Sequence, residues 1–117
     1  MKIRMDFGGT ALTASLEGNA TARDFVSLLP LKLTLEDYAS TEKISDLPRK
    51  LSMAGAPPGT KPSSGDIAYY SPWGNLALFH KSAPYAEGLV RLGKFDSGVD
   101  ALRHPASRRV TIELVGE

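Results

Sequence analysis

Many of the side chains that could bind a ligand or take part in a reaction lie in one stretch of the chain, from Gly65 to Lys81. This stretch holds the only tryptophan, two adjacent tyrosines and a phenylalanine, with polar side chains close by. Aromatic side chains with one polar tip are typical of binding surfaces, but they also pack in cores. We therefore consider both an apolar core cluster and the wall of a binding groove. The ligand-binding residues predicted for such a groove are Tyr38, Glu42, Tyr70, Trp73, Asn75, Phe79 and Lys81.

Three carboxylates are candidates for acid–base chemistry near these rings. Glu42 and Asp37 lie close to Tyr38 in the sequence, and Asp66 precedes the two tyrosines. A carboxyl group whose pKa is raised by burial suits a general base. Asp66 directly follows Gly65, so it could equally close an Asx turn before a strand. Glu42 and Asp37 therefore stand as the candidate catalytic residues.

Several other chemistries are not supported by the sequence. The absence of cysteine excludes a disulfide scaffold, a thiolate zinc site and a cysteine nucleophile. His80 and His104 are far apart and have no acidic partner at metal-ligand spacing, so we expect no metal. No Gly-x-Ser-x-Gly motif occurs, and the prolines of Gly55–Lys61 remove amides that a phosphate loop requires. We expect no cofactor.

Length and charge indicate one ordinary globular domain, residues 1–117. The chain is 42% apolar and 23% charged, with a net charge of +1 and interspersed signs. The basic cluster Arg103, His104, Arg108 and Arg109 is short and has no interleaved aromatics, so we expect neither nucleic acid nor membrane as a partner. No signal-peptide core and no membrane-length apolar run is found, and we expect a cytoplasmic location. The oligomeric state is not indicated.

The first third of the chain reads as a hairpin followed by a helix. Apolar residues alternate with polar ones over 3–7 and 12–16, on either side of a Gly8-Gly9 turn. The spacing then changes, because Ala22, Phe25, Val26 and Leu29 fall on one helical face. Asn19 is a suitable N-cap, and Pro30 disfavours helix at Leu29, where we expect the helix to end. Its apolar face would cover one open end of a sheet or barrel.

Short strands dominate the remainder. We expect strands over 31–36 and 89–95. Between them we expect a polar bend over 37–44 and a turn or short strand over 46–51. The loop over 52–65 is either a lid or a mobile insertion. Two strands flank a turn at Ser71–Gly74, and a helical turn over 99–102 precedes a last strand over 110–114. About eight strands and one capping helix predict an all-β closed barrel, since closure removes exposed edges. An open two-layer α+β sheet is the alternative.

With these elements in order, the chain resembles the small cyclophilin-like barrel proteins of bacteria, a family of unassigned function. The resemblance covers nearly the whole chain and is most specific at Gly65–Phe79. Weaker matches are the Gly8-Gly9 hairpin, Asn19–Phe25, Leu28–Leu31, Asp37-Tyr38 and Glu42–Ile44. It implies a closed barrel related to the cyclophilin fold, without implying an activity.

Cyclophilins are peptidyl-prolyl isomerases, and this chain departs from their active-site pattern. It contains no glutamine and no Phe-His-Arg triplet. The nearest triplet is Phe79-His80-Lys81, and lysine lacks the planar donor fork of arginine. We therefore do not expect true prolyl isomerase activity.

The leading hypothesis is a binding module whose barrel mouth is framed by aromatic rings. Tyr38, Tyr70, Trp73 and Phe79 would wall a groove for a peptide or small ligand, and the predicted polar contacts are Glu42, Asn75 and Lys81. The alternative is an enzyme, either a weak prolyl isomerase or a small hydrolase or isomerase with Glu42 or Asp37 as base. A third hypothesis is an accessory or oligomerisation domain without a small ligand.

Overall fold

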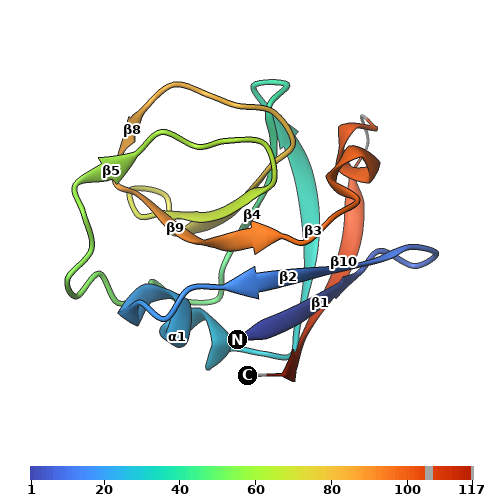
Figure 1. Cartoon of the computed structure of the whole chain (residues 1–117), viewed down its shortest axis with the longest axis horizontal. Coiled ribbons are helices and arrows are strands. Elements are labelled where there is room, and N and C mark those ends of the chain that lie inside the picture. Colours follow the sequence, from blue (N-terminus) through green and yellow to red (C-terminus); the bar gives the residue numbers. More distant parts are fainter. Residues whose placement is uncertain (105–106, 117) are drawn as a thin grey trace.

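The computed structural model of the chain describes residues 1–104 and 107–116, and in it eight antiparallel strands close into a barrel (Figure 1). The strand order around the barrel is β1-β10-β3-β4-β7-β6-β9-β2. The closed all-β barrel is therefore confirmed, and the open sheet is excluded. The barrel strands are β1 (Lys2–Asp6), β2 (Ala11–Leu16), β3 (Leu31–Tyr38), β4 (Glu42–Asp46), β6 (Asp66–Tyr70), β7 (Asn75–Phe79), β9 (Leu89–Phe95) and β10 (Arg108–Gly116).

Alternate residues of every barrel strand fill the interior. The buried side chains of this interior cluster include Ile3 of β1, Leu35 of β3, Leu78 of β7 and Ile112 of β10. Because side chains alternate between the two faces of a strand, the intervening residues face outward. The barrel interior is thus a packed, mostly apolar core. A binding site is therefore expected on the outer face of the barrel wall.

Helix α1 (Ala20–Val26) closes one end of the barrel with buried Ala22 and Phe25. The Asn19 side chain accepts a hydrogen bond from the Ala22 amide at 2.8 Å, which confirms the predicted N-cap. The helix ends at Val26, three residues before the predicted end. The amides of Leu28 and Leu29 bond to carbonyls three residues back, so the last turn tightens before Pro30. The predicted helical turn near residue 100 is a 3-10 helix, η1 (Val99–Arg103).

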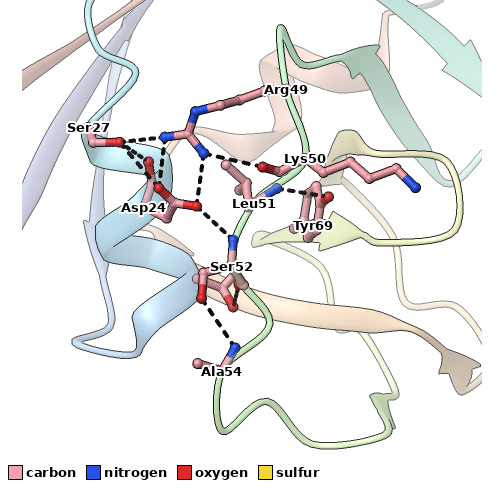
Figure 2. A network of polar contacts seen from close by, with 9 residues as sticks. Asp24, Ser27, Arg49, Lys50, Leu51, Ser52, Ala54 and Tyr69 are labelled. Atoms are coloured by element: carbon pink, nitrogen blue, oxygen red, sulfur yellow. Dashed lines mark hydrogen bonds and ion pairs between the residues drawn. The ribbon is translucent and has the colours of Figure 1, made fainter.

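A polar network fastens the segment after β4 to helix α1 (Figure 2). Asp24 accepts hydrogen bonds from the Arg49 guanidinium at 2.8 and 3.0 Å and from the Ser52 amide at 2.6 Å. The Leu51 amide donates to the Tyr69 hydroxyl at 3.1 Å, which ties the same segment to β6. The long loop that follows therefore begins from a fixed point.

The loop predicted over 52–65 contains a short strand, β5 (Gly59–Thr60), which pairs with β8 (Ala86–Glu87) outside the barrel. We call the two segments 56–62 and 82–88, which this pairing joins, the strap. In Figure 1, β5 and β8 lie outside the barrel near the start of β9, and β5 contacts β9. No helix in the described ranges is long and apolar enough to cross a membrane.

Strand β4 places its side chains differently from a simple apolar alternation. Lys43 faces the barrel interior and is fully buried, with its ammonium 2.6 Å from the Asp37 carboxylate. Its cross-strand neighbours are Asp37 on β3 and Leu78 on β7. Glu42 and Ile44 consequently face outward, on the side where the strap lies.

Candidate functional site

A second apolar cluster lies on the outer face of the wall, separate from the barrel core. Its buried members are Ala68, Ala77, Phe79 and Leu89. Ala68 of β6 and Ala77 of β7 are direct cross-strand partners. Two small side chains facing each other leave a hollow between the larger residues on either side of them.

Residues of the strap cover this hollow, and together with the wall they enclose a cavity of about 410 Å³. The Ala83 amide donates to the Pro62 carbonyl at 3.2 Å, and the Gly88 amide donates to the Pro58 carbonyl at 2.8 Å. These bonds hold the two strap segments together over the wall. The residues that line the cavity are Tyr38, Ala39, Thr41, Glu42, Ile44, Pro62, Tyr70, Trp73, Asn75, Ala77, Phe79, Ala83, Pro84, Tyr85, Ala86 and Leu89.

The cavity brings together most of the residues singled out from the sequence. Tyr38, Glu42, Tyr70, Trp73, Asn75 and Phe79 all line it. They lie on the outer wall under the strap and not around the mouth of the barrel, where we expected them. The reason is that the barrel core uses the opposite faces of β6 and β7.

The remaining candidates lie elsewhere. Lys81 is exposed and does not line the cavity, and Asp37 points to the opposite face, where it pairs with Lys43. Asp66 accepts hydrogen bonds from the Ser63 amide at 2.9 Å and from Arg91 at 3.2 Å. Asp66 therefore anchors the turn before β6 by accepting from the amide three residues before it, which is not the hydrogen bond of the Asx turn suggested by the sequence.

Strand register sets the order of groups along the cavity floor. Glu42 lies directly between Tyr38 on β3 and Phe79 on β7. Asn75 lies four residues along β7 from Phe79 and is paired with Tyr70. At the rise of a β-strand these two ends of the floor are about 13 Å apart. The cavity is thus a trough with Glu42 at one end and Asn75 at the other.

Glu42 is a half-buried carboxyl group in apolar surroundings. Burial raises its pKa from 4.5 to about 7, with desolvation as the cause. Within residues 1–104 and 107–116 its carboxylate makes no hydrogen bond and no ion pair. The neighbouring ammonium of Lys43 lies on the other face of the wall, so it does not neutralise Glu42.

Asn75 is a second polar group at the cavity without full hydrogen bonding. The residue is only 2% exposed, and its Oδ1 atom is buried with no hydrogen-bond partner in the described part of the chain. An unpaired buried polar atom costs free energy that a bound partner could recover.

Trp73 stands at the edge of the cavity between two tyrosines. Its ring centroid is 5.4 Å from those of Tyr38 and Tyr70, at interplanar angles of 89° and 82°. The Trp73 side chain is 54% exposed, so it is not packed away under the loop. The interpretation of the aromatic cluster as pure core packing therefore does not hold for this residue.

The sequence did not point to the strap residues. Tyr85, Ala83 and Pro62 line the cavity from above, and their short segments carry no strand periodicity. The one sequence feature that could have indicated this part of the cavity is the Pro84-Tyr85 pair, which stands in a segment of otherwise small residues. Within the described ranges no group of three or more His, Asp or Glu side chains is placed to hold a metal ion.

Comparison with known proteins agrees with this architecture. The Cyclophilin-like family matches residues 5–113, and the chain belongs to that family. The solution structure of the hypothetical protein AF2241 from Archaeoglobus fulgidus superposes with a TM-score of 0.66 at 19% identity, over 98% of this chain and 95% of that one. At this identity the likeness shows the shared fold. No match was found among curated proteins.

Proposed function

We propose that the protein is a binding module and that the cavity under the strap holds its ligand, a small molecule or a segment of a peptide. The observation that carries this proposal is a preformed cavity of about 410 Å³ walled by aromatic rings and by two polar groups, Glu42 and Asn75, whose side-chain oxygens have no hydrogen-bond partner among the described residues. Ligand sites are typically concave, mostly apolar, and equipped with a few polar groups that fix orientation.

The test uses Trp73, which is the only tryptophan of the chain and lies at the cavity. Its fluorescence should change when a library of small apolar and amphipathic compounds and short peptides contains a ligand. Ala77→Leu adds a side chain to the cavity floor without touching the barrel core, so it should weaken every such ligand at least tenfold. Ala11→Leu, at an exposed position of β2, is the matched control.

Two outcomes speak against this proposal. If no compound or peptide alters Trp73 fluorescence, the cavity is not a binding site for these classes. If ligands are found but bind Ala77→Leu and wild type equally, they occupy another surface.

A second candidate is an acid–base enzyme with Glu42 as the proton-transferring group. The observation that favours it is the pKa of about 7, which suits proton transfer near neutral pH. Chromogenic esters and a proline-containing chromogenic peptide would serve as substrates. An enzyme of this kind should lose its turnover in Glu42→Gln, and its rate should change steeply with pH near 7. Equal rates for the two proteins would remove this candidate.

A further inference from the structure

Among the described residues, the cavity lining carries an acidic side chain and no basic one. In the part of the chain that the structure describes, Glu42 carries the only carboxyl side chain of the lining, and no Lys, Arg or His belongs to it. Three basic residues are direct sequence neighbours of lining residues, and none of them lines the cavity: Lys43, which faces the barrel interior, Lys61, which is exposed, and His80. Lys81, two residues beyond Phe79, is exposed outside the cavity. A ligand group that complements this lining electrostatically is therefore positive.

Aromatic faces surround the acid. Tyr38 and Phe79 are the direct cross-strand neighbours of Glu42, and such neighbours have Cβ atoms about 5 Å apart. Trp73 contacts Tyr38 at right angles. In an edge-to-face contact one ring uses its edge, so ring faces remain available to a cation. Trp73 and Tyr38 are also 54% and 43% exposed, which leaves them accessible from solvent.

Between Glu42 and Asn75 the floor of the cavity is mostly apolar. Ile44, Ala77 and Leu89 contribute only hydrocarbon to the lining. A ligand that places a charge beside Glu42 and also fills the cavity therefore carries an apolar chain along the floor. A bare metal ion does not meet this requirement, since it would face one carboxylate and hydrocarbon.

We propose that the ligand group recognised by this cavity is an alkylammonium, that is, a cationic amine on a short apolar chain, seated between Glu42 and the rings of Tyr38 and Trp73. This inference rests on the proposed function, because it assigns the chemistry of the same cavity. The amine can come from a free small molecule or from a lysine side chain of a peptide, and both present the same ammonium and hydrocarbon stem.

Binding of a cation favours the ionised form of Glu42. Because burial has raised the pKa of Glu42 to about 7, an alkylammonium should release a proton on binding and bind more tightly at pH 8 than at pH 6. The ionised fraction changes about tenfold over this interval, which sets the expected change in affinity. The other titratable groups of the lining are the phenols of Tyr38, Tyr70 and Tyr85. His80 follows Phe79 but does not line the cavity, and desolvation lowers its pKa below 6.5.

The experiment compares three probes of matched length, hexylamine, hexan-1-ol and hexanoate, by Trp73 fluorescence at pH 8. We expect hexylamine to bind at least tenfold more tightly than hexan-1-ol, and hexanoate to bind least. In Glu42→Gln the affinity for hexylamine should fall to that for hexan-1-ol, while hexan-1-ol itself binds as before. Glu113→Gln, at an exposed carboxylate of β10, is the control and should bind all three as wild type does.

N-acetyl-lysine methylamide and a short lysine-containing peptide distinguish the two sources of the amine. If either binds more tightly than hexylamine, the ligand is a peptide side chain; the reverse order assigns a free amine. The inference is overturned if hexan-1-ol binds as tightly as hexylamine, or if Glu42→Gln leaves the preference for hexylamine unchanged. In those cases the cavity still binds a ligand, so the proposed function survives. If none of the probes binds and the wider library also yields no ligand, both fail.

Discussion

At the residue scale, Glu42 differs physically from two well-paired carboxylates, Asp24 and Asp96. Asp24 and Asp96 are surrounded by donors, and hydrogen bonds led by Arg49 and Lys2 respectively lower their pKa values to about 2. Such carboxylates stabilise the fold when ionised, and this contribution is lost as the pH falls from about 4 towards 2. Glu42 receives no hydrogen bond from the residues that the structure describes and is desolvated by burial, so ionising it costs stability. A group that weakens the fold in this way is typical of a site that a ligand completes.

The Glu42→Gln variant should reveal this cost as a pH-dependent gain in stability. The folded-state pKa lies above the unfolded value, so the folded protein binds more protons between pH 4.5 and 7 and loses stability as the pH rises through that range. The full shift corresponds to about 3 kcal/mol. Since the side chain is only half buried, we expect about 1–2 kcal/mol. Glutamine carries no charge and should lack the effect.

The measurement is the free energy of unfolding in urea at pH 5 and pH 8 for both proteins. We expect the free energy of unfolding of Glu42→Gln, relative to that of wild type, to be larger at pH 8 than at pH 5. His80 has an opposite trend, because its pKa is lowered, but it is present in both proteins and cancels in the difference. A difference that does not change with pH would mean that Glu42 is solvated in the folded protein.

At the element scale, the regular hairpins could be predicted from the sequence. The candidate site could be predicted only in part. Alternation with turn residues predicted β1–β2 and β6–β7, because period two and a Gly or Pro turn act locally. Alternation does not say which face points inward, so the aromatic rings were assigned to the barrel mouth. Lys43 shows the difficulty, since a lysine fills an interior position through its pairing with Asp37. The strap was missed because strands of two residues have no period.

The strap supplies a prediction at this scale, through Gly59. A Cβ atom at Gly59 would lie 2.7 Å from the Tyr85 hydroxyl and even closer to the Ala86 backbone oxygen, so Gly59→Ala must displace β5 from β8. Because the strap lies outside the barrel, the free energy of unfolding should change by no more than about 1 kcal/mol. The affinity for cavity ligands should fall several-fold, and the Gly88 amide, which donates to Pro58, should exchange faster.

Trp73 fluorescence titration and amide hydrogen exchange report these two effects. Gly9→Ala serves as the control, because a Cβ atom there has open space around it. Wild-type affinity and wild-type exchange in Gly59→Ala would show that the strap does not shape the cavity.

At the scale of the whole molecule, closure of the barrel is what makes the outer wall available. The interior is filled with apolar side chains, and every barrel strand is paired on both sides, so no edge is left open. The seam between β2 and β9 is short, with three registered pairs from Ala14↔Phe95 to Leu16↔Gly93. Next to it, the β6–β9 register shifts between Ile67 and Ala68, which bends β9. The closure of the barrel therefore depends on close approach at this seam.

Gly93 is the residue that permits that approach. A Cβ atom there would lie 2.8 Å from the Leu16 Cα atom and even closer to the Ser15 backbone oxygen, and backbone atoms cannot rotate away. Gly93→Ala should therefore separate β2 from β9 and lower the free energy of unfolding by about 2–3 kcal/mol. For a domain of this size the melting temperature should fall by roughly 10 °C. Opening the seam also exposes strand edges, so the variant should aggregate at lower concentration.

Thermal and urea unfolding measure the loss, and light scattering measures the association. Gly116→Ala in β10 is a matched control, because its Cβ atom would sit 3.7 Å from the Lys2 Cβ atom, an ordinary contact. That variant should unfold within about 0.5 kcal/mol of wild type. If Gly93→Ala were as stable as Gly116→Ala, the seam would have to absorb an extra methyl group without strain. The barrel would then hold together through its other strand pairs, and tight packing at the β2–β9 seam would not be what closes it.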